Sequence, residues 1–134
     1  MPAGDPPQME TVIEIKDVHK SFADNHVLRG VKLEVKKAQT TVIIGASGSG
    51  KSVLMKHMIG LLRPDSGTVT VDGVDTTTLS ERELSRVREK FGMVFQGAAL
   101  FDSMTVGENV AFPLREHRNL REREIREIVA DKLR

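Results

Sequence analysis

The chain has 134 residues, of which 39% are apolar and 29% charged, and this is the size and composition of one ordinary domain or of part of one. Its 20 basic and 19 acidic residues give a net charge of +1, which does not favour nucleic acid or an anionic membrane as a partner. The absence of cysteine excludes disulfides, thiolate metal sites and cysteine nucleophiles, and it fits a cytosolic protein. No apolar run approaches the roughly 20 residues that span a bilayer, so we expect any membrane attachment to go through a partner.

Residues 1–10 are rich in proline and glycine and contain no apolar segment of the signal-peptide type, so we expect a disordered tail there. Thr11–Lys16 and Val27–Val35 then alternate apolar and polar residues in the manner of β-strands. The polar stretch Ala23–His26 lies between them and predicts a loop. Together these segments predict a pair of antiparallel strands.

Thr40–Ile44 is a different kind of segment, because its residues are β-branched throughout and show no regular alternation. This pattern is typical of a strand that is buried on both faces of a mostly parallel sheet. A glycine-rich turn follows, and then a helix is predicted from about Lys51 to Gly60. Phe91–Phe95 has the same buried-strand character further along the chain.

Between these segments the sequence predicts a second small β element and a helix. Gly67–Val71 alternates as a strand and leads into an Asp72-Gly73 turn. Ser80 is followed three positions later by Glu83, which is a capping-box pattern. We therefore expect a helix that opens there and continues to about Glu89.

The C-terminal part is predicted to consist of a loop and two helices. Gln96–Ser103 has the composition of a loop, and Thr105–Phe112 that of a helix which Pro113 stops. Asn119–Arg134 is strongly charged and has one apolar stripe, which predicts an amphipathic helix. The stripe consists of Ile125, Ile128, Val129 and Leu133.

The turn before the first predicted helix carries the most specific pattern in the chain. Gly45-Ala46-Ser47-Gly48-Ser49-Gly50-Lys51-Ser52 fits G-x-x-x-x-G-K-[ST], and it lies between a predicted buried strand and a predicted helix, as this motif requires. Its glycines let successive backbone N–H groups converge on phosphates, and the helix adds its positive end. The alternative is an accidental glycine-rich turn before a helix.

The motif gives individual residues of this loop a role in binding ATP or GTP. Lys51 is a candidate catalytic residue that reaches the β and γ phosphates, and the Ser52 hydroxyl is a candidate ligand of Mg²⁺. The candidate nucleotide-binding residues of this region are Gly45, Ser47, Gly48, Ser49, Gly50, Lys51, Ser52 and Val53.

A β-rich segment precedes this loop, whereas small kinases and GTPases usually begin almost at theirs. Ile13–Phe22 resembles the opening strand of ABC transporter ATPases, which ends in an aromatic residue that stacks on the adenine ring. Most members of that family have tyrosine there, but the ring face of Phe22 is sufficient for stacking. Phe22 is therefore a candidate nucleotide-binding residue; the alternative is that it packs in the β core.

Later segments resemble the same family. Leu61–Val69 and Val71–Gly73 look like its link from the phosphate-loop helix to the β subdomain, and Phe91–Gln96 looks like the strand that ends in its Q-loop glutamine. The resemblance makes Gln96 a candidate catalytic residue and metal ligand, which contacts Mg²⁺ or the attacking water. The alternative is an ordinary surface glutamine.

The segments Gln96–Val106 and Glu108–His117 are similar to ATPases of Mla-type lipid transporters, which serve phospholipid movement between the membranes of bacterial envelopes. The resemblance implies that Gly97–Phe112 forms part of the groove that accepts a helix of the membrane permease. The expected apolar contacts are Leu100, Phe101 and Met104, unless these side chains only pack between the loop and the helical subdomain.

The implied fold is α/β: a P-loop NTPase of ABC type with an antiparallel β subdomain, an incomplete parallel-sheet core and the start of the helical subdomain. Residues 11–95 would form the ATP-binding core, and residues 96–134 the Q-loop and the beginning of the helical subdomain. The resemblance further implies ATP and Mg²⁺ as cofactors, and a membrane permease and a second copy of the ATPase as partners, with no nucleic acid. The protein would lie peripherally on the cytoplasmic face of the inner membrane.

Three features of the family do not occur in the sequence: the Leu-Ser-Gly-Gly signature, the apolar strand that ends in Asp-Glu, and the switch histidine. The chain also ends at Arg134 inside a predicted helix, as if cut. We therefore expect the full protein to be an ATPase that powers transport, and this chain alone to bind nucleotide without turning it over. A non-catalytic nucleotide-binding module and a soluble ABC ATPase without a permease are the alternative functions.

Overall fold

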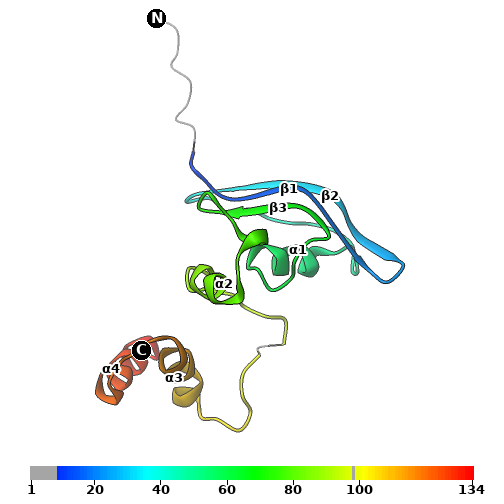
Figure 1. Ribbon diagram of the computed structural model, residues 1–134. Helices are drawn as coiled ribbons and strands as arrows, with labels where there is room; N and C mark the ends of the chain where they lie inside the picture. The colour runs from blue at the N-terminus through cyan, green and yellow to red at the C-terminus, as the bar shows by residue number, and fades with distance from the viewer. Residues whose placement is uncertain (1–8, 98) are drawn as a thin grey trace, which may run out of the picture. The chain divides into compact units, whose positions relative to one another are not determined.

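The computed structural model describes residues 9–97 and 99–134. These residues form two compact units that divide between Gly92 and Met93, and each unit is described by itself (Figure 1). The tail expected over residues 1–10 lies almost entirely outside the described residues. None of the helices in the described part of the chain combines the length and apolarity that a bilayer crossing requires.

The first unit is built on an antiparallel sheet with the strand order β2-β1-β3-β4. Its strands are β1 (Thr11–Phe22), β2 (Asn25–Lys36), β3 (Ser66–Val71) and β4 (Val74–Asp75). The prediction of an antiparallel pair at the start of the chain is confirmed, since β1 pairs antiparallel with β2. Both strands are longer than their alternation indicated, so the expected loop at residues 23–26 shortens to a two-residue turn.

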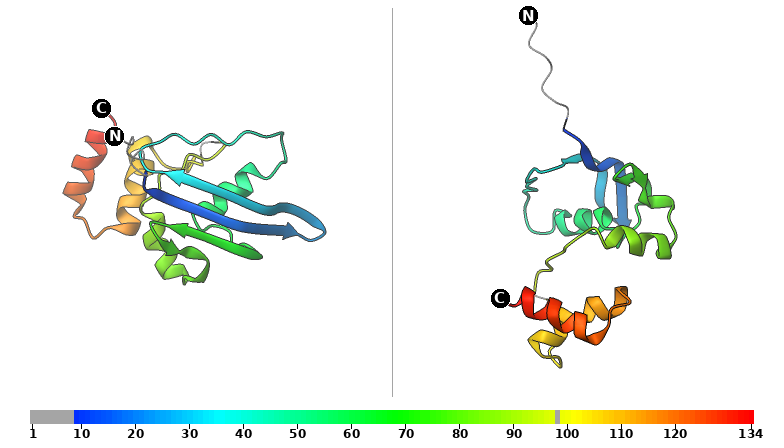
Figure 2. Two further views of the ribbon diagram at one scale, coloured as in Figure 1. Left: turned by 90° about the horizontal axis from the view of Figure 1, so that it is seen from above. Right: turned by 90° about the vertical axis from the view of Figure 1, so that its left-hand side faces the viewer.

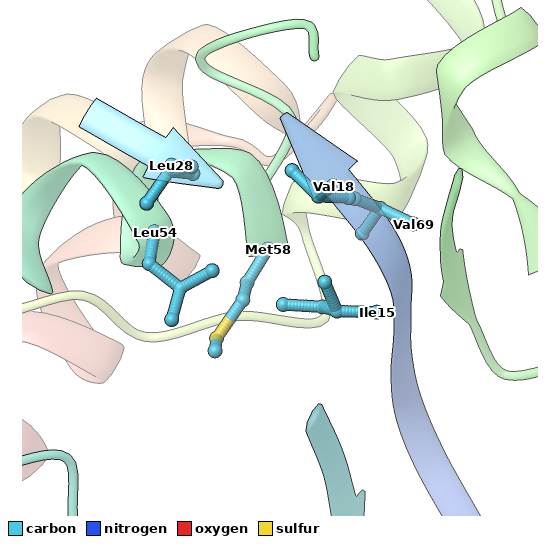
Figure 3. Packing of buried hydrophobic residues seen from close by; sticks show 6 residues of the cluster. All are labelled: Ile15, Val18, Leu28, Leu54, Met58 and Val69. Carbon is cyan, nitrogen blue, oxygen red and sulfur yellow. The ribbon is translucent and has the colours of Figure 1, made fainter. Parts of the chain in front are cut away.

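Helix α1 (Lys51–Met58) lies against one face of this sheet, as the views in Figure 1 and Figure 2 agree. The helix is amphipathic: Leu54 and Met58 are buried, whereas Met55 between them is 44% exposed. Figure 3 shows the two buried side chains directed toward apolar side chains of three strands. The resulting core cluster consists of Ile15, Val18, Leu28, Leu54, Met58 and Val69.

The connection after β3 follows the prediction closely. Asp72 and Gly73 form the turn into β4, a short 3-10 helix η1 (Thr76–Thr78) follows, and α2 (Glu81–Arg88) completes the unit. The capping box that opens α2 is present, because the Ser80 hydroxyl accepts from the N–H of Glu83 and the Glu83 carboxylate accepts from the N–H of Ser80. Leu84 anchors α2 and is 1% exposed.

The two strands predicted to be buried in a parallel sheet are not formed, and this prediction is wrong for the described residues. Residues 40–44 and 91–95 have no regular structure, and Ile44 and Val94 are 91% and 92% exposed. β-branched or aromatic composition favours a strand only where neighbouring strands supply hydrogen-bond partners. Among the described residues neither segment pairs with another strand.

The second unit consists of a loop followed by α3 (Val106–His117) and α4 (Glu122–Lys132). A capping box of Thr105 and Glu108 opens α3 where a helix start was predicted. The prediction that Pro113 ends this helix is wrong, because α3 continues past it to His117. A proline removes one backbone donor from a helix but leaves the later N–H groups able to bond. Ala111 of α3 and Ile125 of α4 are the buried side chains of this helix pair.

Candidate nucleotide-binding site

The phosphate loop joins residues without regular structure to the start of α1. Gly48 and Gly50 adopt φ angles of 77° and 93°, which residues with a Cβ atom rarely adopt. The N–H of Ser49 donates to the carbonyl of Ala46 at 3.1 Å, which closes a turn inside the loop. Gly50 also lies close to β2, since a Cβ atom there would stand 2.9 Å from Cγ1 of Val27. The glycines are therefore required by the backbone path itself.

The N-terminus of α1 differs from those of α2 and α3. Its N-cap is Gly50. Among the described residues, no side chain caps this helix and no acidic residue lies in its first turn. Helices α2 and α3 instead begin with complete capping boxes and carry glutamates there. The first N–H groups of a helix have no partner within it and carry a partial positive charge. The start of α1 thus offers donors to an anion.

Lys51 brings a full positive charge to the same place. Its Nζ donates to the carbonyl oxygens of Gly45 and Ala46 at 2.6 and 2.7 Å and lies 3.4 Å from Oγ of Ser49. The side chain is thereby folded back over the loop. A lysine ammonium is the usual point charge for phosphate in such loops.

The remaining candidates of the loop have different surroundings. Ser47, Gly48, Ser49 and Ser52 are exposed, so their donors can meet a ligand. Val53 packs against the core cluster, so only its backbone N–H can contribute. The donor set is backbone N–H groups, one ammonium and serine hydroxyls, and this set fits a nucleotide polyphosphate with Mg²⁺.

Phe22 ends β1 and is 44% exposed, so its ring does not pack in the β core. The strand pairing links Phe22 to β2, the strand that approaches the phosphate loop. Phe22 is the cross-strand partner of Asn25, two residues before Val27, and Val27 contacts the loop at Gly50. An exposed ring near a phosphate loop can stack on a base.

Two residues that fix the end of β1 were not singled out as site residues from the sequence. The Asp65 carboxylate accepts from Nζ of Lys20 at 2.9 Å and from the backbone N–H of Ser21 at 2.7 Å. Nζ of Lys20 also lies over the Phe22 ring, 5.5 Å from its centroid. Positions 20 and 65 are joined only by the fold, and no local pattern links them.

Gln96 belongs to the second unit, is exposed, and lies in a segment without regular structure. Gly97 follows it with a φ of 90°. The other candidate residues, which are those of the phosphate loop and Phe22, all belong to the first unit.

The second unit contains an apolar groove of about 360 Å³. Asn109 shapes it, because its side chain accepts from the N–H of Phe101 at 2.9 Å and donates to the carbonyls of Phe101 and Met104 at 3.2 Å. The ring of Phe101 packs against that of Phe112, with 4.8 Å between the ring centroids. Leu100 remains 66% exposed at the groove. The groove is lined by Leu100, Phe101, Asp102, Met104, Val106, Asn109 and Val110.

Comparisons with known proteins show the family of this chain. The sequence model of the family described as "ABC transporter" matches residues 28–133. The chain is 46% identical over 125 residues to the probable ribonucleotide transport ATP-binding protein mkl of Mycobacterium leprae, which covers 93% of this chain and 36% of that protein. It is 44% identical over 124 residues to the intermembrane phospholipid transport system ATP-binding protein MlaF of Haemophilus influenzae, which covers 92% of this chain and 47% of that protein.

The fold has a similar relative among solved structures. The dimeric ATP-binding cassette MJ0796, in a post-hydrolysis state bound to ADP and Pi, matches 89% of this chain with a TM-score of 0.79 and 31% identity. The match covers 54% of that chain. This chain therefore spans about half, or less, of the length of each of these three proteins. The chain belongs to the ABC transporter family and corresponds to part of its ATP-binding subunit.

Proposed function

We propose that the protein is the ATP-binding subunit of an ABC transporter that moves a phospholipid or a related hydrophobic substrate in a bacterial envelope. The observation that carries the nucleotide part is the loop at the start of α1, where Lys51 and uncapped helix donors meet. The lipid part rests on the similarity of residues 96–117 to Mla-type ATPases, and the 44% identity to MlaF supports it.

Each candidate residue then has a defined task. Lys51 holds the β and γ phosphates, the loop N–H groups bind their oxygens, and the Ser52 hydroxyl ligates Mg²⁺. Mg²⁺, when bound, neutralises charge on the phosphates. Phe22 stacks on the adenine, and Gln96 orients the attacking water or contacts Mg²⁺ through its side-chain carbonyl.

The groove beside Phe101 supports a membrane permease as the partner. It is apolar and partly exposed, and Asn109 hydrogen-bonds the backbone of the loop that lines it. A permease helix with two or three apolar side chains would fill it. A second copy of the subunit would complete the site, and MJ0796 is a dimer in its solved structure. We place the protein peripherally on the cytoplasmic face of the inner membrane, through this permease.

A second candidate concerns only the substrate. The relative mkl, at 46% identity, is described as a probable ribonucleotide transport protein. The loop and groove are compatible with either cargo, because neither would contact it. Purification of the intact protein with its permease, followed by reconstitution, separates the two. ATP hydrolysis stimulated by phospholipid supports the proposal, whereas stimulation only by ribonucleotides other than ATP and ADP overturns the lipid assignment.

The nucleotide part is tested by thermal unfolding with Mg-ATP. At about 100 times its dissociation constant the ligand stabilises the folded state by about 2.7 kcal/mol. Lys51→Ala should abolish this stabilisation, while Lys56→Ala, at an exposed position of the same helix, should keep it. A folded protein without any shift, or an equal shift in Lys51→Ala, overturns the proposal.

A further inference from the structure

We propose that Lys20 is a positioning residue for the nucleotide base: held by Asp65, its ammonium covers one face of the Phe22 ring and leaves the other face for the adenine. The proposal rests on the proposed function, because it concerns the base of the nucleotide bound at the phosphate loop.

Asp65 fastens the end of β1 at three points. Its backbone N–H donates to the carbonyl of His19 at 2.9 Å. Its carboxylate accepts from Nζ of Lys20 at 2.9 Å and from the N–H of Ser21 at 2.7 Å. Phe22 is the next residue, so the chain segment that carries the ring is fixed immediately before it.

Lys20 is held more closely than a surface lysine usually is. Its side chain is 18% exposed, whereas the side chain of its partner Asp65 is 48% exposed. The Asp65 contact restricts the rotamers of the lysine and sets its ammonium over the ring of Phe22, 5.5 Å from the centroid. A lysine ammonium within about 6 Å of a ring centroid is attracted by the negative ring face.

Lys20 determines which face of the Phe22 ring a base can use, and it makes that face less negative. The faces of two aromatic rings both carry negative charge and repel when they stack directly. An ammonium on one face of Phe22 draws electron density toward itself, so the opposite face becomes less negative and repels the π system of a base less. The resulting order is ammonium, phenyl ring, base.

The Asp65 carboxylate is charged whenever this arrangement is needed. The hydrogen bond from Lys20, followed by that from the N–H of Ser21, holds its pKa below the ordinary value of 3.8. At neutral pH the contact with Lys20 is therefore an ion pair. Asp65 also lies in the segment that follows α1, so one helix connects the phosphate loop with the residue that fixes the base platform.

The test compares two ligands in the intact protein: Mg-ATP, and Mg-tripolyphosphate, which has no base. Lys20→Met keeps the length of the side chain and removes its charge. We expect it to weaken ATP binding roughly two- to fivefold and to leave tripolyphosphate binding unchanged. Asp65→Ala should act in the same direction, Lys20→Arg should restore ATP binding, and the control Lys56→Met should change neither ligand.

A double-mutant cycle shows whether the lysine acts through the ring. In a Phe22→Leu background, Lys20→Met should cause no further loss of ATP affinity. Three results would overturn the inference: equal ATP affinity of the wild type and Lys20→Met, a parallel loss of affinity for both ligands, or an undiminished loss in the Phe22→Leu background. In each case, ATP binding by the wild type would still uphold the proposed function. A folded wild type that binds neither ligand would overturn both.

Discussion

The backbone of Gly67 passes the carbonyl of Asp17 so closely that a Cβ atom at Gly67 would overlap its oxygen. The carbonyl oxygen of Lys16 would lie only 2.6 Å from the same Cβ atom. The contact occurs where the pairing of β1 with β3 shifts register, between Lys16 and His19. Asp17 and Gly67 have φ angles of 49° and 87° there. The sheet can keep this irregularity only with glycine at position 67.

Gly67→Ala is therefore expected to destabilise the first unit more than Gly73→Ala. Both glycines have positive φ, but a Cβ atom at Gly73 would meet nothing within 4 Å. Gly73→Ala should cost only the conformational strain, about 1 kcal/mol, and Gly67→Ala should cost clearly more because backbone atoms must move. Urea denaturation of both variants measures the difference. Equal losses would show that β1 and β3 separate at little cost.

Two methionines of α1 provide a test of how the helix packs. Met58 is 8% exposed in the core cluster, whereas Met55 is 44% exposed on the same helix. Met58→Ala should lower the free energy of unfolding by about 2 to 5 kcal/mol, through lost transfer energy and the cavity it leaves. Met55→Ala should change it by less than about 0.5 kcal/mol. If both variants lose the same amount, α1 does not pack on the sheet as described.

The elements that the sequence predicted correctly are those whose determinants are local. The Ser80–Glu83 capping box lies within one helical turn, and α2 begins where this pattern indicated. Helix α3 likewise begins after Thr105, where a helix start was predicted. The glycine pattern of the phosphate loop likewise determines a turn followed by α1. The resemblance to ABC transporter ATPases supplied the family, which the comparisons confirm.

The predictions that were wrong or missing depend on partners far along the chain. Thr40–Ile44 has the composition of a buried strand, but a strand needs neighbours, and Ile44 is exposed. The continuation of α3 past Pro113 is an exception, because it requires only that the later N–H groups of the same helix find partners. The ion pair of Lys20 with Asp65 joins positions that no sequence pattern relates. Such contacts follow from the fold and not from local composition.

The capping box of α3 makes a pH-dependent contribution to stability. The Glu108 carboxylate accepts from the N–H and the hydroxyl of Thr105 at 2.7 and 2.8 Å. These hydrogen bonds hold the pKa of Glu108 below its ordinary value of 4.5. A lowered folded-state pKa stabilises the folded protein above the unfolded pKa, and this contribution is lost as the pH falls through the folded pKa.

Glu108→Gln keeps the shape of the side chain and removes its titration. We expect this variant to lose less stability than the wild type when urea denaturation is repeated from neutral pH down to about pH 3. Glu116→Gln, in the last turn of the same helix, is the control. An identical pH profile for Glu108→Gln and the wild type would show that the capping contact does not influence unfolding.

The exposed apolar segments predict the solution behaviour of this chain. Val42, Ile44 and Val94 are 72%, 91% and 92% exposed, and exposed apolar residues promote association. We expect the chain by itself to aggregate, and Ile44→Thr with Val94→Thr to raise the monomer fraction in size-exclusion chromatography. Val71→Thr, at a buried position, should lower it instead. A monodisperse wild-type monomer that melts cooperatively would contradict this expectation.

Gln96 is expected to act in ATP turnover by the intact protein. A residue that orients the attacking water acts mainly in the transition state, so its loss lowers kcat more than ground-state binding. Gln96→Ala should reduce kcat roughly 100-fold and leave the affinity for Mg-ATP nearly unchanged. Gln39→Ala, at an exposed glutamine of the first unit, should leave both unchanged. If Gln96→Ala weakens ATP binding and keeps kcat, the glutamine binds nucleotide and has no part in the chemical step.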